Sequence, residues 1–292
     1  MLPVHIALFF VSLLYAILFS WAGQIMPTYL TPEAFVLLRI FTAFTLFQIT
    51  ARLFQWEKIN WKLHAKEFAI CAFFGTCANM YLFFKGLELT HPINGAILML
   101  VTPLFVGVFD HLRIKKRPKF WFVFGTITAA SGSLWLMFGK GAHFNERTIR
   151  GDIFVAINAL FYAVYLVRVK KLTAVYQPVT VNRITFLFGL LFMLPVGIIP
   201  LLHVNFNHIP NNIYAKISYI LFFTSFLVYL LNAFAVKKAG PTLAGIYIYL
   251  QPVLAAIIAV ILGTDVLTPL KATLIFTIMI GVWIATRNSP KS

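Results

Sequence analysis

Charged residues are scarce in this chain. Only 11% of its 292 residues are Asp, Glu, Lys or Arg, and 61% are hydrophobic. A soluble domain carries roughly 25% charged residues. Because so few charges cannot cover a water-exposed surface of this size, the composition excludes a soluble globular fold. It indicates an integral membrane protein whose main solvent is the lipid bilayer.

Acidic residues are the scarcest charges, eight against 24 Lys and Arg. All eight fall in loops or near the ends of apolar segments, so the sequence gives no support to a proton relay through a central carboxylate. The basic residues form short clusters between apolar runs, as in 111–119. That pattern is typical of cytoplasmic loops facing anionic lipid headgroups. We therefore expect the bilayer, and not nucleic acid, as the partner of these charges.

Residues for metal, redox or nucleotide chemistry are also few. Cys71 and Cys77 share one apolar run, so they predict packing and no disulfide framework. The seven histidines are scattered, and no Walker A sequence is present. The sequence therefore predicts no catalytic residues, no metal site and no cofactor.

Long apolar runs dominate the chain. A membrane-spanning helix needs about 20 apolar residues. Ten segments meet that length, and Pro, Gly, Asn or charged residues separate them. They are 4–23, 33–53, 67–87, 93–112, 120–139, 151–169, 180–202, 215–235, 242–262 and 269–286. The fold class expected is an all-α integral membrane protein of ten transmembrane helices.

The Lys and Arg residues are unevenly divided between the two sides of these helices. Six lie in loops or near helix ends on one side, and two, Arg39 and Arg183, lie within helices. The other side holds 16: Arg52, Lys58, Lys62, Lys66, Arg113, Lys115, Lys116, Arg117, Lys119, Arg168, Lys170, Lys171, Lys237, Lys238, Arg287 and Lys291. The positive-inside rule then places both termini in the cytoplasm.

The second half of the chain echoes the first. Residues 81–92, followed by Pro103, match residues 230–241, followed by Pro252, at an offset of 149. Five spans per half is an odd number, so 1–145 and 146–292 are predicted to be two inverted five-helix repeats. Such halves suit alternating access. Pro103 and Pro252 should kink their helices and are candidate conformational hinges.

Five segments together resemble the EamA branch of the drug/metabolite transporter superfamily. They are Gly86–Asn94 with Thr102–Phe105, Gly151–Tyr165, Leu250–Ala255, Leu262–Thr268 and Pro32–Arg39. The resemblance implies export or exchange of small metabolites, with location in a bacterial inner membrane. The chain departs from the family pattern after the fourth span, where Lys115 and Lys116 replace the usual acidic residue and Asp110 is the nearest carboxylate. After the ninth span, Asp265 stands where the family usually has Glu.

Two cations inside apolar segments are candidate substrate-binding residues, because a charge in hydrocarbon is costly. Lys85 could attract a substrate carboxylate or phosphate, or it could extend to the membrane surface and pair with Glu88. Arg39 could line a vestibule, bond the carbonyls of a neighbouring helix, or pair with Glu33. Both readings of each residue stay open at this point.

Uncharged polar residues complete the predicted site. In the family, helices 1, 3, 4, 6, 8 and 9 surround a central cavity, so the resemblance points these side chains inward. The competing interpretations are hydrogen bonds between helices for the amides and interfacial anchoring for the tyrosines. The predicted substrate-binding residues are Asn79, Asn94, Asn158, Gln251, Tyr15, Tyr162 and Tyr247.

The leading interpretation is a secondary transporter of a small polar or amphipathic metabolite, such as an amino acid or another solute bearing an organic anion. The alternative is a polytopic membrane enzyme, such as a lipid-modifying transferase, without transport activity. A catalytic cluster of His, Asp or Glu at one interface would favour the enzyme. The oligomeric state is left open, with a homodimer among the options.

Overall fold

The structure is a computed structural model that describes residues 1–54, 57–90, 95, 98–114, 118–138, 146–261 and 268–287. All the secondary structure in these ranges is helical. The first half contributes α1 (Leu2–Ile25), α2 (Pro32–Phe54), α3 (Trp61–Ala72), α4 (Ala78–Leu89), α6 (Thr102–Ile114) and α7 (Phe120–Phe138). The second half contributes α8 (Glu146–Val175), α9 (Pro178–Leu202), α10 (Asn211–Tyr219), α11 (Val228–Ala239), α12 (Pro241–Ile246), α13 (Leu250–Ile261) and α14 (Pro269–Arg287).

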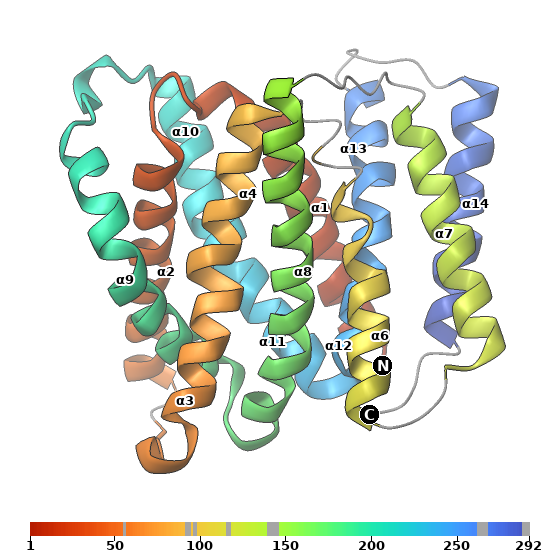
Figure 1. The fold of residues 1–292 in the computed structure, drawn as a ribbon, viewed down its shortest axis with the longest axis horizontal. Helices are drawn as coiled ribbons and strands as arrows, with labels where there is room; N and C mark the ends of the chain where they lie inside the picture. The colour runs from red at the N-terminus through yellow and green to blue at the C-terminus, as the bar shows by residue number, and fades with distance from the viewer. Residues whose placement is uncertain are drawn as a thin grey trace.

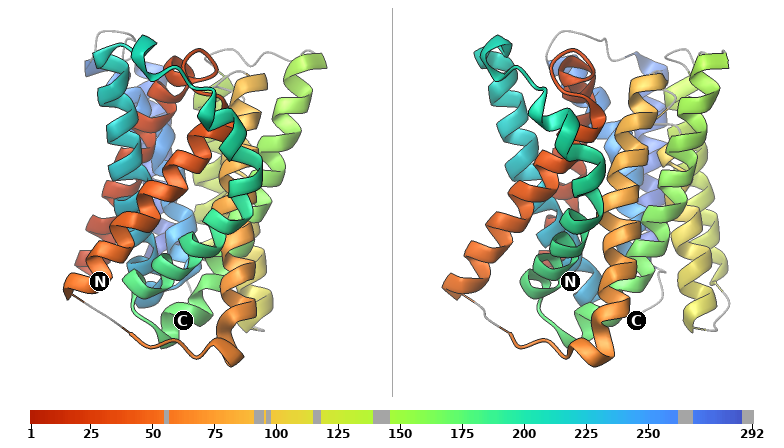
Figure 2. Two further views of the ribbon diagram at one scale, coloured as in Figure 1. Left: turned by 90° about the vertical axis from the view of Figure 1, so that its left-hand side faces the viewer. Right: turned by 60° about the vertical axis from the view of Figure 1, so that its left-hand side comes forward.

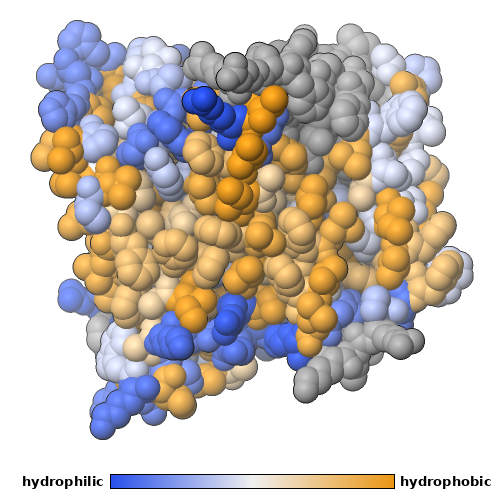
Figure 3. Space-filling view, in the orientation of Figure 1, coloured by the Kyte–Doolittle hydropathy of each residue, from blue (hydrophilic) through white to orange (hydrophobic). Residues whose placement is uncertain are grey.

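Apolar helices of membrane-spanning length are the main element of the fold. Seven continuous helical stretches in the described ranges are long and apolar enough to cross a bilayer, and Phe120–Gly132 and Ala272–Ala285 are shorter apolar helices. Apolar residues cover the middle of the face in Figure 3, and hydrophilic residues lie at its two ends. The chain is thus a multi-pass membrane protein. Predicted span 93–112 lies partly outside the described residues.

Proline and glycine set several helix boundaries. Pro32, Pro178, Pro241 and Pro269 each begin a helix, where the missing N–H costs little. Gly240 separates α11 from α12 with a φ of 87°, a left-handed conformation that favours glycine. These boundaries let antiparallel helices follow one another through short connections.

Two helices contain π-helical segments at matching places in the two halves. One is η1 (Phe73–Cys77), between α3 and α4, and the other is η3 (Ile220–Leu227), between α10 and α11. The offset of 149 between the halves places Phe73–Cys77 within Ile220–Leu227. Short π-helical segments inside α-helices occur frequently at functional sites.

The helices form one bundle with a pair at each side. α2 packs against α9 on the left of Figure 1, and α7 packs against α14 on the right. α1, α4, α6, α8, α11, α12 and α13 lie between the two pairs in Figure 1. In the left view of Figure 2 the α2–α9 pair lies in front of the other helices. α1 begins and α14 ends at the lower end of Figure 1, called the termini end below.

Glycine allows the α7–α14 pair to pack at very short range. A Cβ atom on Gly281 would lie 2.4 Å from the Ala129 backbone nitrogen, and one on Gly125 would lie 2.5 Å from that of Ala285. Small residues at such crossings let helix backbones approach closely in lipid, where packing and not hydrophobicity drives association. The pair therefore joins the last helix of each half.

Candidate functional site

A small cavity lies at the centre of the bundle, among helices of both halves. Its volume is about 40 Å³, and a single water needs roughly 10–15 Å³ by the same measure. This conformation therefore has room for a few waters only. The lining residues are Tyr15, Phe19, Arg39, Asn79, Met80, Phe83, Phe84, Met99, Asn158, Tyr162, Tyr229, Ile248 and Gln251.

Arg39 supplies a cation at this cavity and is itself only 2% exposed. Its Nε donates to Ser225 Oγ at 2.8 Å, and its Nη2 donates to Thr224 Oγ1 at 3.2 Å. The guanidinium also lies over the Phe84 ring, 4.7 Å from the centroid, which is cation–π geometry. Hydroxyls and an aromatic face hold the arginine in place without neutralising it.

The π-helical segment η3 explains why two hydroxyls meet Arg39. Thr224 Oγ1 and Ser225 Oγ both donate to the Ile220 carbonyl oxygen, at 2.8 and 3.2 Å. Each hydroxyl has one proton to donate and lone pairs left to accept. With their protons directed to Ile220, both oxygens present lone pairs to the guanidinium. Arg39, in the first half, is thereby held by the second half.

The charge of Arg39 is not balanced by a carboxylate in the part of the chain that the structure describes. No Asp or Glu is among the cavity residues. The alternative that Arg39 pairs with Glu33 is wrong, because the Glu33 carboxylate instead pairs with Lys85 at 3.2 Å. An unneutralised charge is costly in a membrane interior, which makes Arg39 a candidate functional residue. The cavity therefore carries a positive charge.

Asn79 and Asn158 join α4 to α8 through reciprocal hydrogen bonds. Asn158 Nδ2 donates to the backbone carbonyl oxygen of Asn79 at 2.7 Å, and Asn79 Nδ2 donates to the backbone carbonyl oxygen of Asn158 at 3.3 Å. The Asn158 Oδ1 atom is buried without a hydrogen-bond partner in the structure. A buried acceptor of this kind can accept a hydrogen bond from a donor group of a bound solute.

Three tyrosine hydroxyls lie in or beside the cavity. Tyr15 and Tyr162 are within hydrogen-bonding reach of each other, and Asn232 Nδ2 donates to Tyr162 Oη at 3.1 Å. Tyr229 Oη donates to the Gly75 carbonyl, within η1, at 2.7 Å. The cavity wall therefore combines aromatic faces with fixed hydroxyl groups.

Lys85 lies outside the cavity, in an ion-pair cluster between α2 and α4. Its Nζ is 2.8 Å from Glu88 Oε2 and 3.2 Å from Glu33 Oε1. Tyr81 Oη donates to Glu33 Oε1 at 3.4 Å. The sequence alternative of a Lys85–Glu88 pair is thus formed, with Glu33 as a second anion. Substrate binding by Lys85 stays a prediction.

The remaining predicted binding residues divide three ways. Gln251 lines the cavity, whereas Tyr247 lies outside it, with His5 Nδ1 hydrogen-bonded to its Oη at 2.7 Å. Asn94 lies outside the described residues. The structure therefore brings together Tyr15, Arg39, Asn79, Asn158, Tyr162 and Gln251, from five helices.

Both predicted hinge prolines follow an interruption of a helix. A 3₁₀ segment at Tyr247–Tyr249 separates α12 from α13, and Pro252 has no N–H to donate to the Ile248 carbonyl four residues earlier. The equivalent position before Pro103 is Met99, followed by turns at residues 100–101. Met99 and Ile248, 149 positions apart, both line the cavity. Whether the prolines act as hinges stays a prediction.

Several residues of the site were absent from the sequence prediction. Tyr229 lines the cavity, and Thr224 with Ser225 holds Arg39. Two consecutive hydroxyl residues inside an apolar run were a usable signal. The offset of 149 also aligns them with Gly75 and Thr76 of the first half.

A cluster suited to metal or acid–base chemistry does not occur within the described residues. No group of three or more His, Cys, Asp or Glu side chains in these ranges could hold a metal ion. The structure thus offers the polytopic-enzyme alternative no positive support. The polar groups that do converge at the cavity are one guanidinium, amides and hydroxyls.

A bundle of membrane-spanning helices around a polar cavity defines a multi-pass membrane protein, and comparison with known families identifies its class as a membrane transporter. The model of the EamA-like transporter family matches this chain twice, in residues 2–138 and 149–287. The chain therefore belongs to the EamA-like transporter family.

Individual relatives are distant but consistent with that membership. The chain is 25% identical to the "Uncharacterized transporter YyaM" of Bacillus subtilis over 213 residues, 72% of this chain and 70% of that protein. It is 22% identical over 262 residues to an "Uncharacterized transporter" of Archaeoglobus fulgidus, covering 89% and 90%. One solved crystal structure superposes with a TM-score of 0.78 at 17% identity over 99% of each chain, which shows a shared fold.

Proposed function

We propose that this protein is a secondary transporter that moves a small organic anion through the central cavity by alternating access. The observation that carries the proposal is the buried guanidinium of Arg39, which lines the cavity without a carboxylate partner among the described residues. A planar guanidinium suits the two oxygens of a carboxylate or phosphate.

The rest of the cavity wall supports an amphipathic solute. Phe19, Phe83 and Met80 offer apolar contact, and Asn158 and the tyrosines offer hydrogen bonds. Aromatic rings with polar tips suit a ligand that is polar at one end and apolar at the other. A carboxylate-bearing solute with a small apolar body, such as an amino acid, has this chemistry.

A cavity of about 40 Å³ must enlarge before it holds such a solute. The paired interruptions near Met99 and Ile248 are where the two halves could change shape, with Pro103 and Pro252 as hinges. Inverted halves that rock against each other around a fixed site are the usual basis of alternating access. We include the ten-helix, inverted-repeat arrangement and the boundary near residue 145 in this proposal.

Hydrogen bonds between the halves close the bundle at both ends. At the termini end, Thr242 Oγ1 of α12 donates to Asp110 Oδ2 of α6 at 2.5 Å. At the opposite end, Thr90 Oγ1 donates to Asp152 Oδ1 of α8, also at 2.5 Å. In an alternating cycle, each of these bonds breaks when its own end opens.

The orientation is also part of the proposal. Sixteen of the 24 Lys and Arg residues lie on the side of the termini end by sequence, which supports a cytoplasmic position for both termini. The inner membrane is proposed from the family resemblance. The substrate is a small molecule, and the protein acts without catalytic residues or a cofactor.

Counterflow in proteoliposomes tests this function. Vesicles preloaded with a pool of unlabelled amino acids and carboxylates receive traces of labelled solutes in matched pairs, each carboxylate with its uncharged amide. The expected result is saturable accumulation of at least one carboxylate and none of its amide. Accumulation of amides or cations in preference to anions, or of no solute in the pool, would contradict the proposal.

A further inference from the structure

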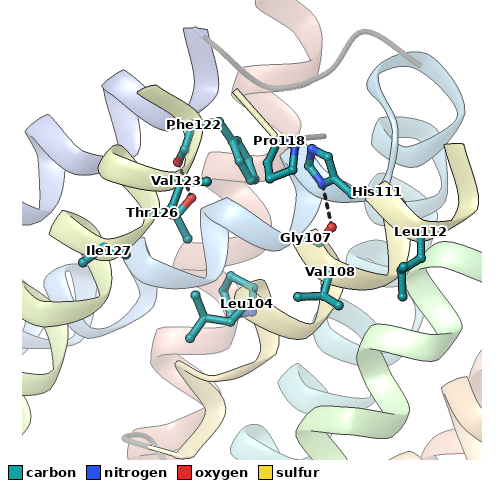
Figure 4. Close-up of a pocket in the computed structure, with 11 residues that line it drawn as sticks. Leu104, Gly107, Val108, His111, Leu112, Pro118, Phe122, Val123, Thr126 and Ile127 are labelled. Atoms are coloured by element: carbon teal, nitrogen blue, oxygen red, sulfur yellow. Dashed lines mark hydrogen bonds between the residues drawn. The ribbon is translucent and has the colours of Figure 1, made fainter. Parts of the chain in front are cut away.

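A hollow larger than the central cavity lies elsewhere in the bundle. It is a groove of about 550 Å³ between α6 and α7, within the roughly 300–1,000 Å³ of typical ligand sites. Its walls are mainly apolar, as Figure 4 shows. Leu104 and Val108 of α6 face Phe122, Val123 and Ile127 of α7.

The groove exists because α7 packs against α14 and not against α6. The glycine contacts of α7 with α14 hold it away from α6. Gly107 adds space, since a Cβ there would still be 3.6 Å from Phe122. Val108 is 55% exposed and Ile127 is 58% exposed, so the groove opens to the surroundings of the protein. In a bilayer, those surroundings are lipid chains.

A second hollow of about 400 Å³ is lined by α1, α14, the 3₁₀ segment η4 (Tyr247–Tyr249) and α13. Tyr247, Leu250 and Trp283 are among its lining residues. It is lined by α13 and α14, the last two helices of the second half, just as the groove is lined by α6 and α7, the last two of the first. Both hollows contain a histidine, His5 in one and His111 in the other.

The groove becomes basic toward the termini end. His111 lines it and is 8% exposed, with Nδ1 bonded to the Gly107 carbonyl at 2.6 Å. Pro118, another lining residue, is followed by the exposed Lys119. Arg113, in the last turn of α6, is paired with Asp110 at 2.7 Å, so the exposed Lys119 supplies the positive charge at this end. An apolar channel with a lysine and an imidazole at one end complements a lipid that has an apolar chain and an anionic headgroup.

We propose that the groove between α6 and α7 is a binding site for an anionic phospholipid of the leaflet at the termini end. One acyl chain lies along Leu104, Val108 and Ile127, and the phosphate lies near His111 and Lys119. Basic sites between transmembrane helices are suited to anionic headgroups. A second copy of this chain is a poorer occupant, because it would bring a like charge to a basic surface.

Native mass spectrometry of the full-length protein tests the site. The delipidated protein is titrated with phosphatidylglycerol or phosphatidylcholine of identical acyl chains. We expect one phosphatidylglycerol to bind at least 10-fold more tightly than phosphatidylcholine. Val108→Trp, which fills the groove, should abolish that preference, and Lys119→Gln should weaken phosphatidylglycerol binding several-fold.

Matched controls separate the groove from general effects on the surface. Ile49→Trp changes an α2 residue of similar exposure, 49%, and Lys62→Gln removes another exposed cation. Both should bind phosphatidylglycerol as the unaltered protein does. Equal binding of the two lipids, unchanged binding in Val108→Trp, or conversion of a dimer to a monomer by Val108→Trp would overturn the proposal. The last result would identify a second copy as the occupant.

Discussion

The central cavity and the groove between α6 and α7 differ in size by an order of magnitude, about 40 against about 550 Å³. Polarity follows the opposite order, because the smaller hollow is the more polar of the two. A guanidinium, amides and tyrosine hydroxyls from both halves converge on the small cavity, whereas mainly apolar side chains of two neighbouring helices line the large groove.

This contrast follows from the solvent that each hollow meets. A polar group in the bilayer interior needs a partner, so polar residues gather where helices enclose them. A groove that faces lipid needs no polar group, because an acyl chain fills it without loss of hydrogen bonds. In a membrane protein, volume alone therefore does not identify the transport site. Convergent polar chemistry is the better guide.

Arg39 should show the largest effect on transport. Removing one partner of a buried charge pair costs about 2–5 kcal/mol, so Arg39→Gln should lower anion counterflow by about 100-fold at low substrate concentration. Arg39→Lys, which keeps the charge but not the planar fork, should fall in between. Arg52→Gln changes an exposed arginine of the same helix and should transport normally. Normal counterflow by Arg39→Gln, with the variant as abundant as the unaltered protein, would contradict an anion-binding site in the central cavity.

Gly281 should show the largest effect on packing beside the groove. A leucine there meets the backbone of Ala129, and overpacking of this kind typically costs about 1–3 kcal/mol. Gly281→Leu should therefore lower the midpoint of thermal unfolding in detergent by several degrees. Gly23→Leu is the matched control, since a Cβ on Gly23 has nothing within 4 Å. Equal unfolding temperatures for the two variants would contradict the close α7–α14 packing.

Thr242 tests the contact that closes the termini end. Thr242→Val removes the hydroxyl that donates to Asp110, and a hydrogen bond to a charged group is worth about 1.5–3 kcal/mol. We expect a loss of stability at the low end of that range, because Arg113 still pairs with Asp110 at 2.7 Å. A double-mutant cycle with Asp110→Ala, which removes the acceptor, measures the coupling. Additive effects would show that the two side chains do not interact.

Ile127 should show the smallest effect. Its side chain is 58% exposed at the groove, and exposed substitutions usually change stability by less than about 0.5 kcal/mol. Ile127→Ala should leave both the unfolding temperature and anion counterflow unchanged. A fall in counterflow of more than about threefold would indicate that the groove is part of the transport path. The central cavity and the groove would then not differ in their role in transport.

The sequence predicted helix positions better than side-chain partners. Composition and apolar runs define spans, and the offset of 149 anticipated matching helix interruptions before Pro103 and Pro252. Arg39 was correctly singled out as costly, but its partners, Thr224 and Ser225, are 185 and 186 residues away. Their meeting depends on the crossing of α2 with η3, a tertiary feature. Hydropathy contains no information about such a contact.

Lys85 and Tyr247 also show how little the sequence says about the partners of a polar side chain. Lys85 was a candidate for substrate binding because a charge in an apolar helix is costly, and Tyr247 because the family resemblance points it inward. In the structure each has a partner outside the cavity, Glu33 and Glu88 for Lys85 and His5 for Tyr247. The sequence offered Glu88 as a partner of Lys85 but neither Glu33 nor His5, because the cost of burial shows that a polar residue needs a partner without saying which one.

The most direct test uses a single cysteine at position 80, because Met80 lines the central cavity and is 3% exposed. Cys71 and Cys77 are first replaced by alanine, and Met80→Cys is then labelled with membrane-impermeant methanethiosulfonate reagents from either side of sealed vesicles. We predict labelling from both sides, faster with the anionic ethylsulfonate than with the cationic trimethylammonium reagent, and no such preference after Arg39→Gln. Labelling from one side only, or equal rates for the two charges with Arg39 present, would contradict an alternately accessible anion site.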